Sequence, residues 1–359
     1  MENMIKKLKS VSNILIYGTE EILNTTCIFL NKFGVECKKV IVKQENVVAD
    51  EAIYKLSCEM AGIDILLVAT RMEYQEKIMT KLSNVKIGNI IFITGELYNF
   101  LKLEYVKKCY EENGNPIVRL GDLSKNKNFS EVNGEVKVFM VKSDKDKVLK
   151  NKVELPNWVV PIQAGRACTD VEIAEVTDSK GDNISEKNSR YCELTAMYWI
   201  WKNTNYKYTG LCHYRRHFVI DEADVNYLLG SDIDVVLPTP SVCNGSVKEY
   251  YYRNHIASHW EDMMKLLKDK YFEYYKTAKE VFNKEYYYAC NMLIARKEVF
   301  DEYCSWLFGI LFELEKVCEP QTDKYHGRYM GFLAERLTSL YFMHNKDRLK
   351  IVHVEKNFI

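Results

Sequence analysis

Short apolar runs alternate with amphipathic stretches in the first third of the chain. Residues 13–17, 37–42, 63–69 and 89–93 are apolar runs typical of buried strands, and helical spacing separates them. Gly34 follows the first helical stretch, in the position where glycine often ends a helix. Strands that alternate with helices predict a parallel sheet with helices on both faces, which is a Rossmann-like parallel-sheet module.

The remaining chain predicts a second, larger α/β domain. Strand-like runs occur at residues 136–141, 208–212, 233–237, 286–295 and 351–354. Helical spacing occurs at residues 193–201, 247–268 and 299–314, and again from residue 327. Residues 121–134 are polar and rich in Asn, Lys and Ser, as in a linker. We therefore expect an accessory domain over residues 1–125 and a second domain over residues 135–359.

The strand-like run 208–212 is followed directly by four polar residues, His213, Tyr214, Arg215 and Arg216. In open α/β sheets, ligands bind beyond the carboxyl ends of the strands. Two neighbouring arginines suit phosphate because each guanidinium is a planar fork of donors that stays charged. The alternative is that both arginines pair with carboxylates such as Asp182 and Glu193, which would make them structural.

Composition excludes several classes of protein. Fifty basic and fifty acidic residues give no net charge, which argues against a general nucleic-acid binder. The eleven cysteines include no Cys-x-x-Cys pair, so we expect free thiols in a reducing compartment rather than zinc or disulfides. No apolar run is long enough for a membrane span, and the start of the sequence lacks a signal-peptide pattern. The prediction is a cytoplasmic protein.

The first module lacks the dinucleotide-binding fingerprint. Gly18 is followed by Thr19, Glu20 and Glu21, where that fingerprint needs further glycines. Both glutamates would also repel a phosphate. We therefore expect a module without cofactor that serves docking or regulation, and the sequence argues against a nicotinamide-dependent oxidoreductase.

The order of several motifs in the last two-thirds of the sequence resembles a family of bacterial glycosyltransferases. That family comes from capsule and exopolysaccharide clusters and is catalogued as domain of unknown function 4422. The motifs are Pro161-Ile-Gln-Ala-Gly165, Gly181-Asp-Asn-Ile-Ser-Glu-Lys-Asn188, Tyr191-Cys-Glu-Leu-Thr195, Tyr198-Trp-Ile-Trp201, Gly210-Leu-Cys-His-Tyr-Arg-Arg216, Asn254-His255, Asn291-Met292, residues 300–308, and Gly331-Phe-Leu-Ala-Glu-Arg336.

This resemblance implies a GT-A-like α/β glycosyltransferase domain. It would transfer a hexose, first of all galactofuranose, from a UDP-sugar donor to a lipid-linked oligosaccharide acceptor during surface polysaccharide synthesis. An acceptor in the inner leaflet implies peripheral membrane contact, which residues 250–255 would supply. The alternative is an inactive sugar-nucleotide-binding or docking partner of another transferase.

Candidate site residues fall into three groups. The catalytic candidates are Glu335 as general base, with Arg215 and His213 stabilising the leaving diphosphate. The nucleotide-sugar candidates are Pro161, Gln163, Gly165, Asp182, Asn183, Tyr191, Glu193, Tyr214 and Arg216. The acceptor or cleft candidates are His255, Asn291 and Met292.

Several of these candidates have a structural alternative. The loop at Gln163 and Gly165 is otherwise an ordinary turn, Asp182 and Asn183 are otherwise a turn and helix cap, and Asn291 is otherwise a satisfied buried amide. Glu193 competes with Glu335 as the base.

A bound metal is not expected. Many transferases with this kind of fold hold a divalent metal with an Asp-x-Asp motif after a central strand. The two Asp-x-Asp sequences of this chain, Asp144 to Asp146 and Asp232 to Asp234, do not follow a predicted central strand. His255 and His259 are four residues apart on a predicted helix, but no His-Glu-x-x-His pattern is complete. The prediction is metal-independent departure of the diphosphate.

Overall fold

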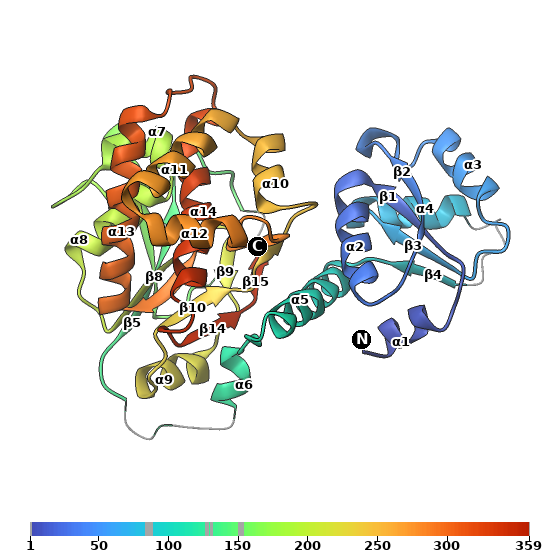
Figure 1. Cartoon of the computed structure of the whole chain (residues 1–359), viewed down its shortest axis with the longest axis horizontal. Helices are drawn as coiled ribbons and strands as arrows, with labels where there is room; N and C mark the ends of the chain where they lie inside the picture. The colour runs from blue at the N-terminus through green and yellow to red at the C-terminus, as the bar shows by residue number, and fades with distance from the viewer. Residues whose placement is uncertain (1, 83–88, 126–128, 130–131, 150–153, 359) are drawn as a thin grey trace. The chain divides into compact units, whose positions relative to one another are not determined.

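The computed structural model describes the chain apart from residues 1, 83–88, 126–128, 130–131, 150–153 and 359. The chain forms two compact units, Met1–Pro116 and Ile117–Ile359 (Figure 1). The division falls earlier than residue 125 because α6 (Leu120–Ser124) belongs to the second unit, where Ser124 Oγ donates to Asp224 Oδ1 at 2.5 Å. Part of the polar segment that we expected to join the domains lies outside the described residues.

The first unit contains a four-stranded parallel sheet, as predicted. Its strands are β1 (Ile14–Thr19), β2 (Lys38–Val42), β3 (Ile65–Ala69) and β4 (Asn89–Phe92), in the order β2-β1-β3-β4. Helices α2 (Glu20–Lys32) and α5 (Gly95–Glu112) pack together on one face of the sheet, and α3 (Asp50–Cys58) and α4 (Met72–Leu82) cover the other (Figure 1). The short helix α1 (Glu2–Lys9) precedes β1.

Gly18 has a packing role in this sheet. A Cβ atom at Gly18 would lie 2.0 Å from the carbonyl oxygen of Ala69 on the neighbouring strand β3. Only glycine therefore allows β1 and β3 to approach each other at this point. The glycine that suggested a dinucleotide site is explained by strand packing alone.

A larger mixed sheet forms the centre of the second unit. Its main path runs in the order β14-β10-β13-β8-β5-β6-β7, and β9 and β15 extend it as a ribbon next to β8. The strands are β5 (Val136–Lys142), β6 (Val159–Gln163), β7 (Val176–Thr177), β8 (Tyr208–His213), β9 (Arg216–Phe218), β10 (Val235–Pro238), β13 (Leu293–Arg296), β14 (Ile351–Val354) and β15 (Lys356–Phe358). A separate pair joins β11 (Ser241–Val242) to β12 (Tyr286–Tyr287).

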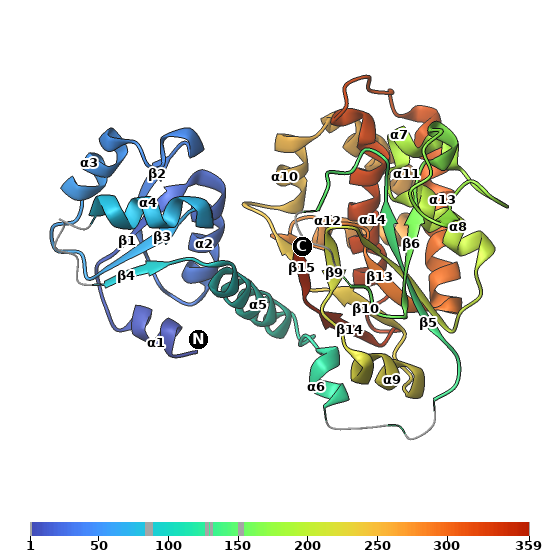
Figure 2. The same cartoon turned by 180° about the vertical axis from the view of Figure 1, so that it is seen from behind.

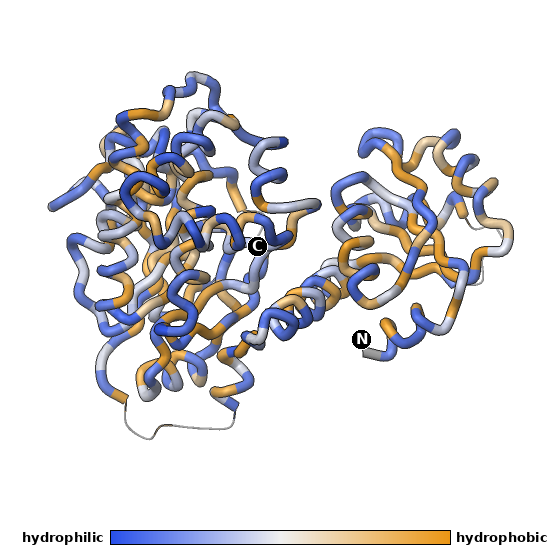
Figure 3. Tube along the Cα trace, in the orientation of Figure 1, coloured by the Kyte–Doolittle hydropathy of each residue, from blue (hydrophilic) through white to orange (hydrophobic). Residues whose placement is uncertain are grey.

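Helices cover both faces of this sheet (Figures 1 and 2). One face carries α7 (Asn188–Tyr191), α8 (Leu194–Asn203), α10 (Val247–Asn254), α11 (Ala257–Lys270), α12 (Phe272–Val281), α13 (Lys297–Val317) and α14 (Tyr329–His344). The other face carries α6 and α9 (Glu222–Gly230). Apolar residues follow the strands inside each unit, whereas the outer helices alternate between polar and apolar positions (Figure 3). This pattern is the amphipathicity on which the helix predictions rested.

One predicted helix is wrong. Residues 247–268 form two helices, α10 and α11, because His255 is extended at φ −139° and ψ −179° and interrupts the helical hydrogen bonding. The i, i+4 relation between His255 and His259 on a single helix therefore does not exist. Among the residues that the structure describes, no helix combines the length and hydrophobicity that crossing a membrane requires.

Candidate functional site

The candidate site lies at one edge of the large sheet. Strands β5, β6, β7 and β8 are parallel, with Val141 opposite His213 and Gln163 opposite both Lys142 and Thr177. Their carboxyl ends therefore meet at the same edge, which is where open α/β sheets bind ligands. Strands β10 and β14 run in the same direction as β8, since β13 is antiparallel to β8 and to β10.

The predicted cations lie in a tight hairpin at this edge. Strand β8 turns into β9 through Tyr214 and Arg215, and His213 pairs with Arg216 across the turn. The guanidinium of Arg215 lies over the rings of Tyr214 and Phe358 at 5.4 and 5.7 Å, and that of Arg216 lies over Phe358 at 5.5 Å. The hairpin thus holds two cations side by side against one aromatic ring.

These arginines have no acidic partner among the described residues. Neither Arg215 nor Arg216 forms an ion pair with a carboxylate there, so they do not pair with Asp182 or Glu193. The Nε atom of Arg215 is buried and, within the described chain, has no hydrogen-bond partner. A buried donor on a cation is costly unless something accepts from it. An anionic ligand would satisfy it.

A strained turn between β12 and β13 gathers the remaining candidates. Cys290 and Asn291 both have left-handed backbones, with φ of 76° and 49°. The Cys290 N–H donates to Glu335 Oε1 at 2.7 Å, and His213 Nε2 lies 2.7 Å from the Cys290 carbonyl oxygen. Asn291 Nδ2 donates to Glu193 Oε1 at 2.8 Å. The turn therefore brings His213, Glu193, Glu335 and Asn291 together, as a shared site requires.

Such backbone conformations cost energy and persist only where surrounding contacts enforce them. Asn291 is fully buried, and its amide also donates to the Gly331 carbonyl at 3.2 Å and accepts from Thr338 Oγ1 at 3.3 Å. Cys192, directly before Glu193, is also left-handed at φ 51°. Non-glycine strain of this kind is common at functional sites.

The two carboxylates of the site differ in how many of their oxygens already accept a hydrogen bond. Both oxygens of Glu335 are engaged, Oε1 by the Cys290 N–H and Oε2 by Arg336 Nη1 at 2.8 Å. Arg336 is fully buried, and its guanidinium lies over the rings of Tyr287 and Tyr251 at 4.7 and 5.1 Å. Glu193 has one oxygen on Asn291, and its second oxygen has no partner in the described part of the chain. Glu193 is therefore better placed to take a proton.

The acidic pair Asp144 and Asp146 follows β5, an interior strand beside β8, which corrects the prediction that this pair lies away from a central strand. Burial raises the pKa of Asp146, while His213, Lys142 and Arg215 act in the opposite direction, which places this carboxyl near the cations. Asp232 and Asp234 are engaged by Lys350 and Arg296 before β10, at the opposite edge.

The described side chains at this edge do not form a metal site by themselves. The described residues contain no group of three or more His, Cys, Asp and Glu side chains arranged to hold a metal ion. The side chains that follow β8 are two arginines and a histidine bonded to a carbonyl oxygen, whereas hard divalent cations need several oxygen ligands. Metal-independent departure of the diphosphate therefore stays a prediction.

Two predicted nucleotide-binding residues are engaged within their own loop. The Gln163 amide donates to the Val171 carbonyl at 2.7 Å and accepts from the Ile173 N–H at 2.9 Å. The Gly165 N–H donates to the buried carboxylate of Asp178 at 2.8 Å, and a Cβ at Gly165 would lie 2.5 Å from Asn188. The close approach that requires this glycine is made by the protein, so both residues support the loop rather than face a ligand.

Other predicted ligand residues lie outside the cluster at the turn. Asp182 accepts from Tyr198 Oη at 3.1 Å and its carbonyl oxygen accepts from Asn203, at the end of α8 opposite to Glu193. Asn183 bonds to its own turn at Ser179 and Gly181, which is the structural alternative. Two further candidates are core residues. Tyr191 is fully buried and its hydroxyl donates to Glu315, and Met292 is buried in the hydrophobic cluster between the sheet and α9. Pro161 lies within β6.

His255 lies against the helix that carries Glu335. Its ring stacks on Phe332 of α14, with ring centroids 4.0 Å apart and planes inclined by 26°. Burial, together with the charges of Arg336, His326 and Arg328, lowers the pKa of His255 to about 3. The ring is therefore neutral at physiological pH and packs as an aromatic side chain.

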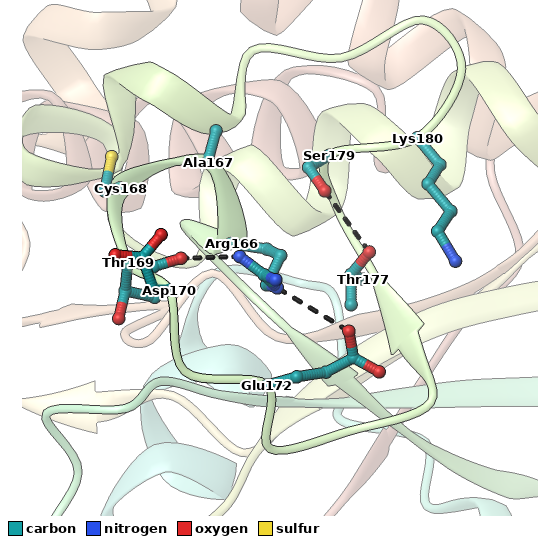
Figure 4. A pocket seen from close by; sticks show the side chains of 9 residues that line it. All are labelled: Arg166, Ala167, Cys168, Thr169, Asp170, Glu172, Thr177, Ser179 and Lys180. Carbon is teal, nitrogen blue, oxygen red and sulfur yellow. Dashed lines mark hydrogen bonds and ion pairs between the residues drawn. The ribbon is translucent and has the colours of Figure 1, made fainter.

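A polar pocket of about 450 Å³ lies beside the edge strand β7 (Figure 4). Arg166 faces the middle of the pocket, where it donates to the Thr169 carbonyl at 2.5 Å and lies 3.8 Å from Glu172. Lys180 and the hydrogen-bonded pair Thr177 and Ser179 form the opposite wall. The pocket is three strand spacings of about 4.8 Å away from β8, at the same edge.

Sequence reasoning missed three residues of the site. The sequence pattern places Asp146 away from a central strand, does not separate Cys290 from the strand-like run around it, and gives no role to Lys356. Lys356 Nζ lies 3.8 Å from Cys290 Sγ and 3.4 Å from Ser241 Oγ. Its signal was its position, since it comes two residues after the predicted strand 351–354, at the carboxyl edge.

Comparison with known proteins supports the assignment of fold. Residues 137–346 match the family model described as domain of unknown function (DUF4422). The solved apo structure of the bifunctional glycosyltransferase WbbM is similar, with a TM-score of 0.56 and 28% identity over 63% of this chain and 45% of that chain. The match thus spans less than half of that protein. No curated protein matches the sequence. The predicted fold class, a parallel-sheet module followed by a glycosyltransferase-like α/β domain, is confirmed.

Proposed function

The chain belongs to the DUF4422 family, and from that premise we propose that its second unit is a glycosyltransferase of polysaccharide synthesis. The likeness to a solved glycosyltransferase supports this proposal. One observation links the proposal to a site: Arg215 and Arg216, at the carboxyl end of β8, form no ion pair with an acidic residue in the described chain. A fold alone does not fix a function, whereas partly buried cations without an ion pair in the described chain would be stabilised by an anion.

In the proposed reaction, Arg215 and Arg216 bind the diphosphate of a nucleotide-sugar donor. The oxygen of an acceptor hydroxyl forms a bond to the anomeric carbon, and the bond from that carbon to the phosphate oxygen breaks. The electron pair leaves on the diphosphate, where the fixed cations stabilise the developing charge. Glu193 takes the hydroxyl proton, which corresponds to an inverting mechanism.

The other residues of the cluster position these groups. Glu335 accepts from Arg336 and from the Cys290 N–H, and thereby holds the strained turn in place. The turn positions Asn291 to donate to Glu193. The nucleoside part of the donor would extend from the arginines past Asp146 toward the pocket beside β7. Our specific proposal is a UDP-hexose donor, with galactofuranose first, and a lipid-linked glycan acceptor at the cytoplasmic face of the membrane.

Nucleotide binding to the full chain tests the proposal. Isothermal titration with UDP, in the presence of EDTA, should give binding that Arg215→Ala weakens by about 10- to 100-fold, since a hydrogen bond to a charged group contributes about 1.5–3 kcal/mol. Arg348→Ala is the matched control, because Arg348 pairs with Glu302 and precedes β14, at the opposite edge. The control should bind UDP as the wild type does.

The outcomes separate the candidate functions. Slow hydrolysis of a UDP-sugar, lost in Arg215→Ala, would support a transferase. Binding of UDP without hydrolysis of any donor would favour an inactive sugar-nucleotide-binding partner. If no nucleoside diphosphate binds, the proposed function is wrong.

A further inference from the structure

We infer that β15 completes the donor site and that Lys356 is a third cation on the leaving diphosphate. This inference rests on the proposed function and adds a residue that contacts the substrate. Strand β15 follows β14 after a single residue, Glu355, and pairs with β9, the strand that carries Arg216. It therefore extends the β8–β9 hairpin that carries Arg215 and Arg216.

The pairing register places Lys356 on the same face as Arg216. Phe358 is opposite Arg216, Asn357 is opposite His217, and Lys356 is opposite Phe218. Side chains of directly opposite residues share a face, and successive residues alternate between faces. Arg216, Phe358 and Lys356 therefore project to one side of the ribbon, and Asn357 and His217 project to the other.

The surroundings of Lys356 confirm this placement. Its ammonium group contacts the Cys290 thiol and the Ser241 hydroxyl at 3.8 and 3.4 Å, which are weak partners for a cation. Within the described chain it forms no ion pair with a carboxylate. Burial raises the pKa of the Cys290 thiol, Lys356 and Arg216 act in the opposite direction, and Glu335 and Glu193 raise it further, so both cations and both carboxylates lie near this thiol.

Three partly buried cations without acidic partners match the charge of a diphosphate better than two do. As the bond between the anomeric carbon and the phosphate oxygen breaks, the electron pair stays on the diphosphate and its charge grows. An ammonium group is a compact point charge that can follow this growth, whereas the arginines fix the phosphate orientation. Phe358 lies against both guanidinium groups and sets their position.

The test measures binding of UDP and of inorganic pyrophosphate to the full chain and four variants. Lys356→Gln should weaken both ligands by about 10-fold or more, as Arg216→Gln does, because each change removes a charged donor. Lys356→Arg keeps the charge and should stay within about threefold of wild type. Asn357→Ala is the matched control on the opposite face of β15 and should bind both ligands normally.

The failure of this inference can be distinguished from failure of the proposed function. Wild-type affinity in Lys356→Gln would overturn the role of Lys356 and leave the transferase proposal intact. A 10-fold loss in Lys356→Arg or in Asn357→Ala would show that β15 acts through its shape rather than through the lysine charge, which also overturns the inference. If the wild type binds neither UDP nor another nucleoside diphosphate, both proposals are wrong.

Discussion

Glu193 and Glu335 meet at one strained turn, yet their hydrogen bonds give them different chemistry. A general base needs a carboxylate oxygen that is free to approach the acceptor hydroxyl. Both oxygens of Glu335 are engaged by donors, whereas Glu193 is bonded through one oxygen only. Sequence position suggested Glu335 as the base, but the contacts favour Glu193.

Replacing each carboxylate by its amide should separate these roles. Glu193→Gln should lower kcat by about 100-fold or more while UDP affinity stays within about twofold, because general-base catalysis contributes about 10²- to 10⁴-fold. Glu335→Gln should mainly lower the thermal midpoint, since the new amide would direct N–H groups at the buried Arg336. Steady-state kinetics and thermal unfolding of both variants check this. An inactive but fully stable Glu335→Gln beside an active Glu193→Gln would restore Glu335 as the base.

The location of the cations could be predicted from the sequence, because the apolar run 208–212 ends directly before His213, Arg215 and Arg216. The roles of Gln163, Gly165 and Asp182 could not, since the sequence does not show where the hydrogen bonds of these residues go. The left-handed backbone at Cys290 and Asn291 was equally hidden, because no glycine marks it. Lys356 required the register between β9 and β15.

At the scale of elements, the periods of apolar residues predicted most strands and helices and missed the break between α10 and α11. Apolar spacing continues through residues 254–257, so a two-residue interruption leaves no trace in the pattern. The break has a structural consequence, because it turns the His255 ring onto Phe332 of α14. A histidine that a regular helix would have placed differently becomes part of the packing around the candidate site.

We expect this packing to make the second unit less stable in acid. The pKa of His255 is lowered to about 3 in the fold, mainly by burial, whereas a free histidine titrates near 6.5. Between these values only the unfolded chain takes up the proton, so the stability contributed by the neutral ring is complete above about pH 6.5 and is lost as the pH falls. His255→Phe should therefore be more stable than wild type at pH 5, by at most about 2 kcal/mol, with no such advantage at pH 7.5.

Thermal unfolding at the two pH values measures this difference, which corresponds to about 4–8 °C in the midpoint. Tyr325→Phe is the matched control, because it keeps the ring that stacks on His255 at 5.9 Å and changes no histidine. Its midpoint should fall with pH as the wild-type midpoint does. Parallel pH curves for wild type and His255→Phe would exclude His255 as the source of the acid sensitivity.

At the scale of the whole molecule, the alternation of strands and helices was enough to predict two α/β units. The boundary was placed too late, because α6 is short and its attachment to α9 through Ser124 and Asp224 cannot be read from its own residues. The order of strands in the large sheet also depended on pairings between segments far apart in the chain, such as β8 with β13 and β9 with β15.

Each unit has its own hydrophobic core, and every residue of the proposed donor site belongs to the second unit. A chain of residues 117–359 should therefore fold alone and bind UDP within about twofold of the full chain, since no donor contact would be lost. Circular dichroism and a single cooperative unfolding transition would establish that the truncated chain is folded, and titration would then give its affinity. Arg215→Ala in the truncated chain should weaken binding as it does in the full chain. A folded 117–359 chain that no longer binds UDP would show instead that the parallel-sheet module contributes to the donor site.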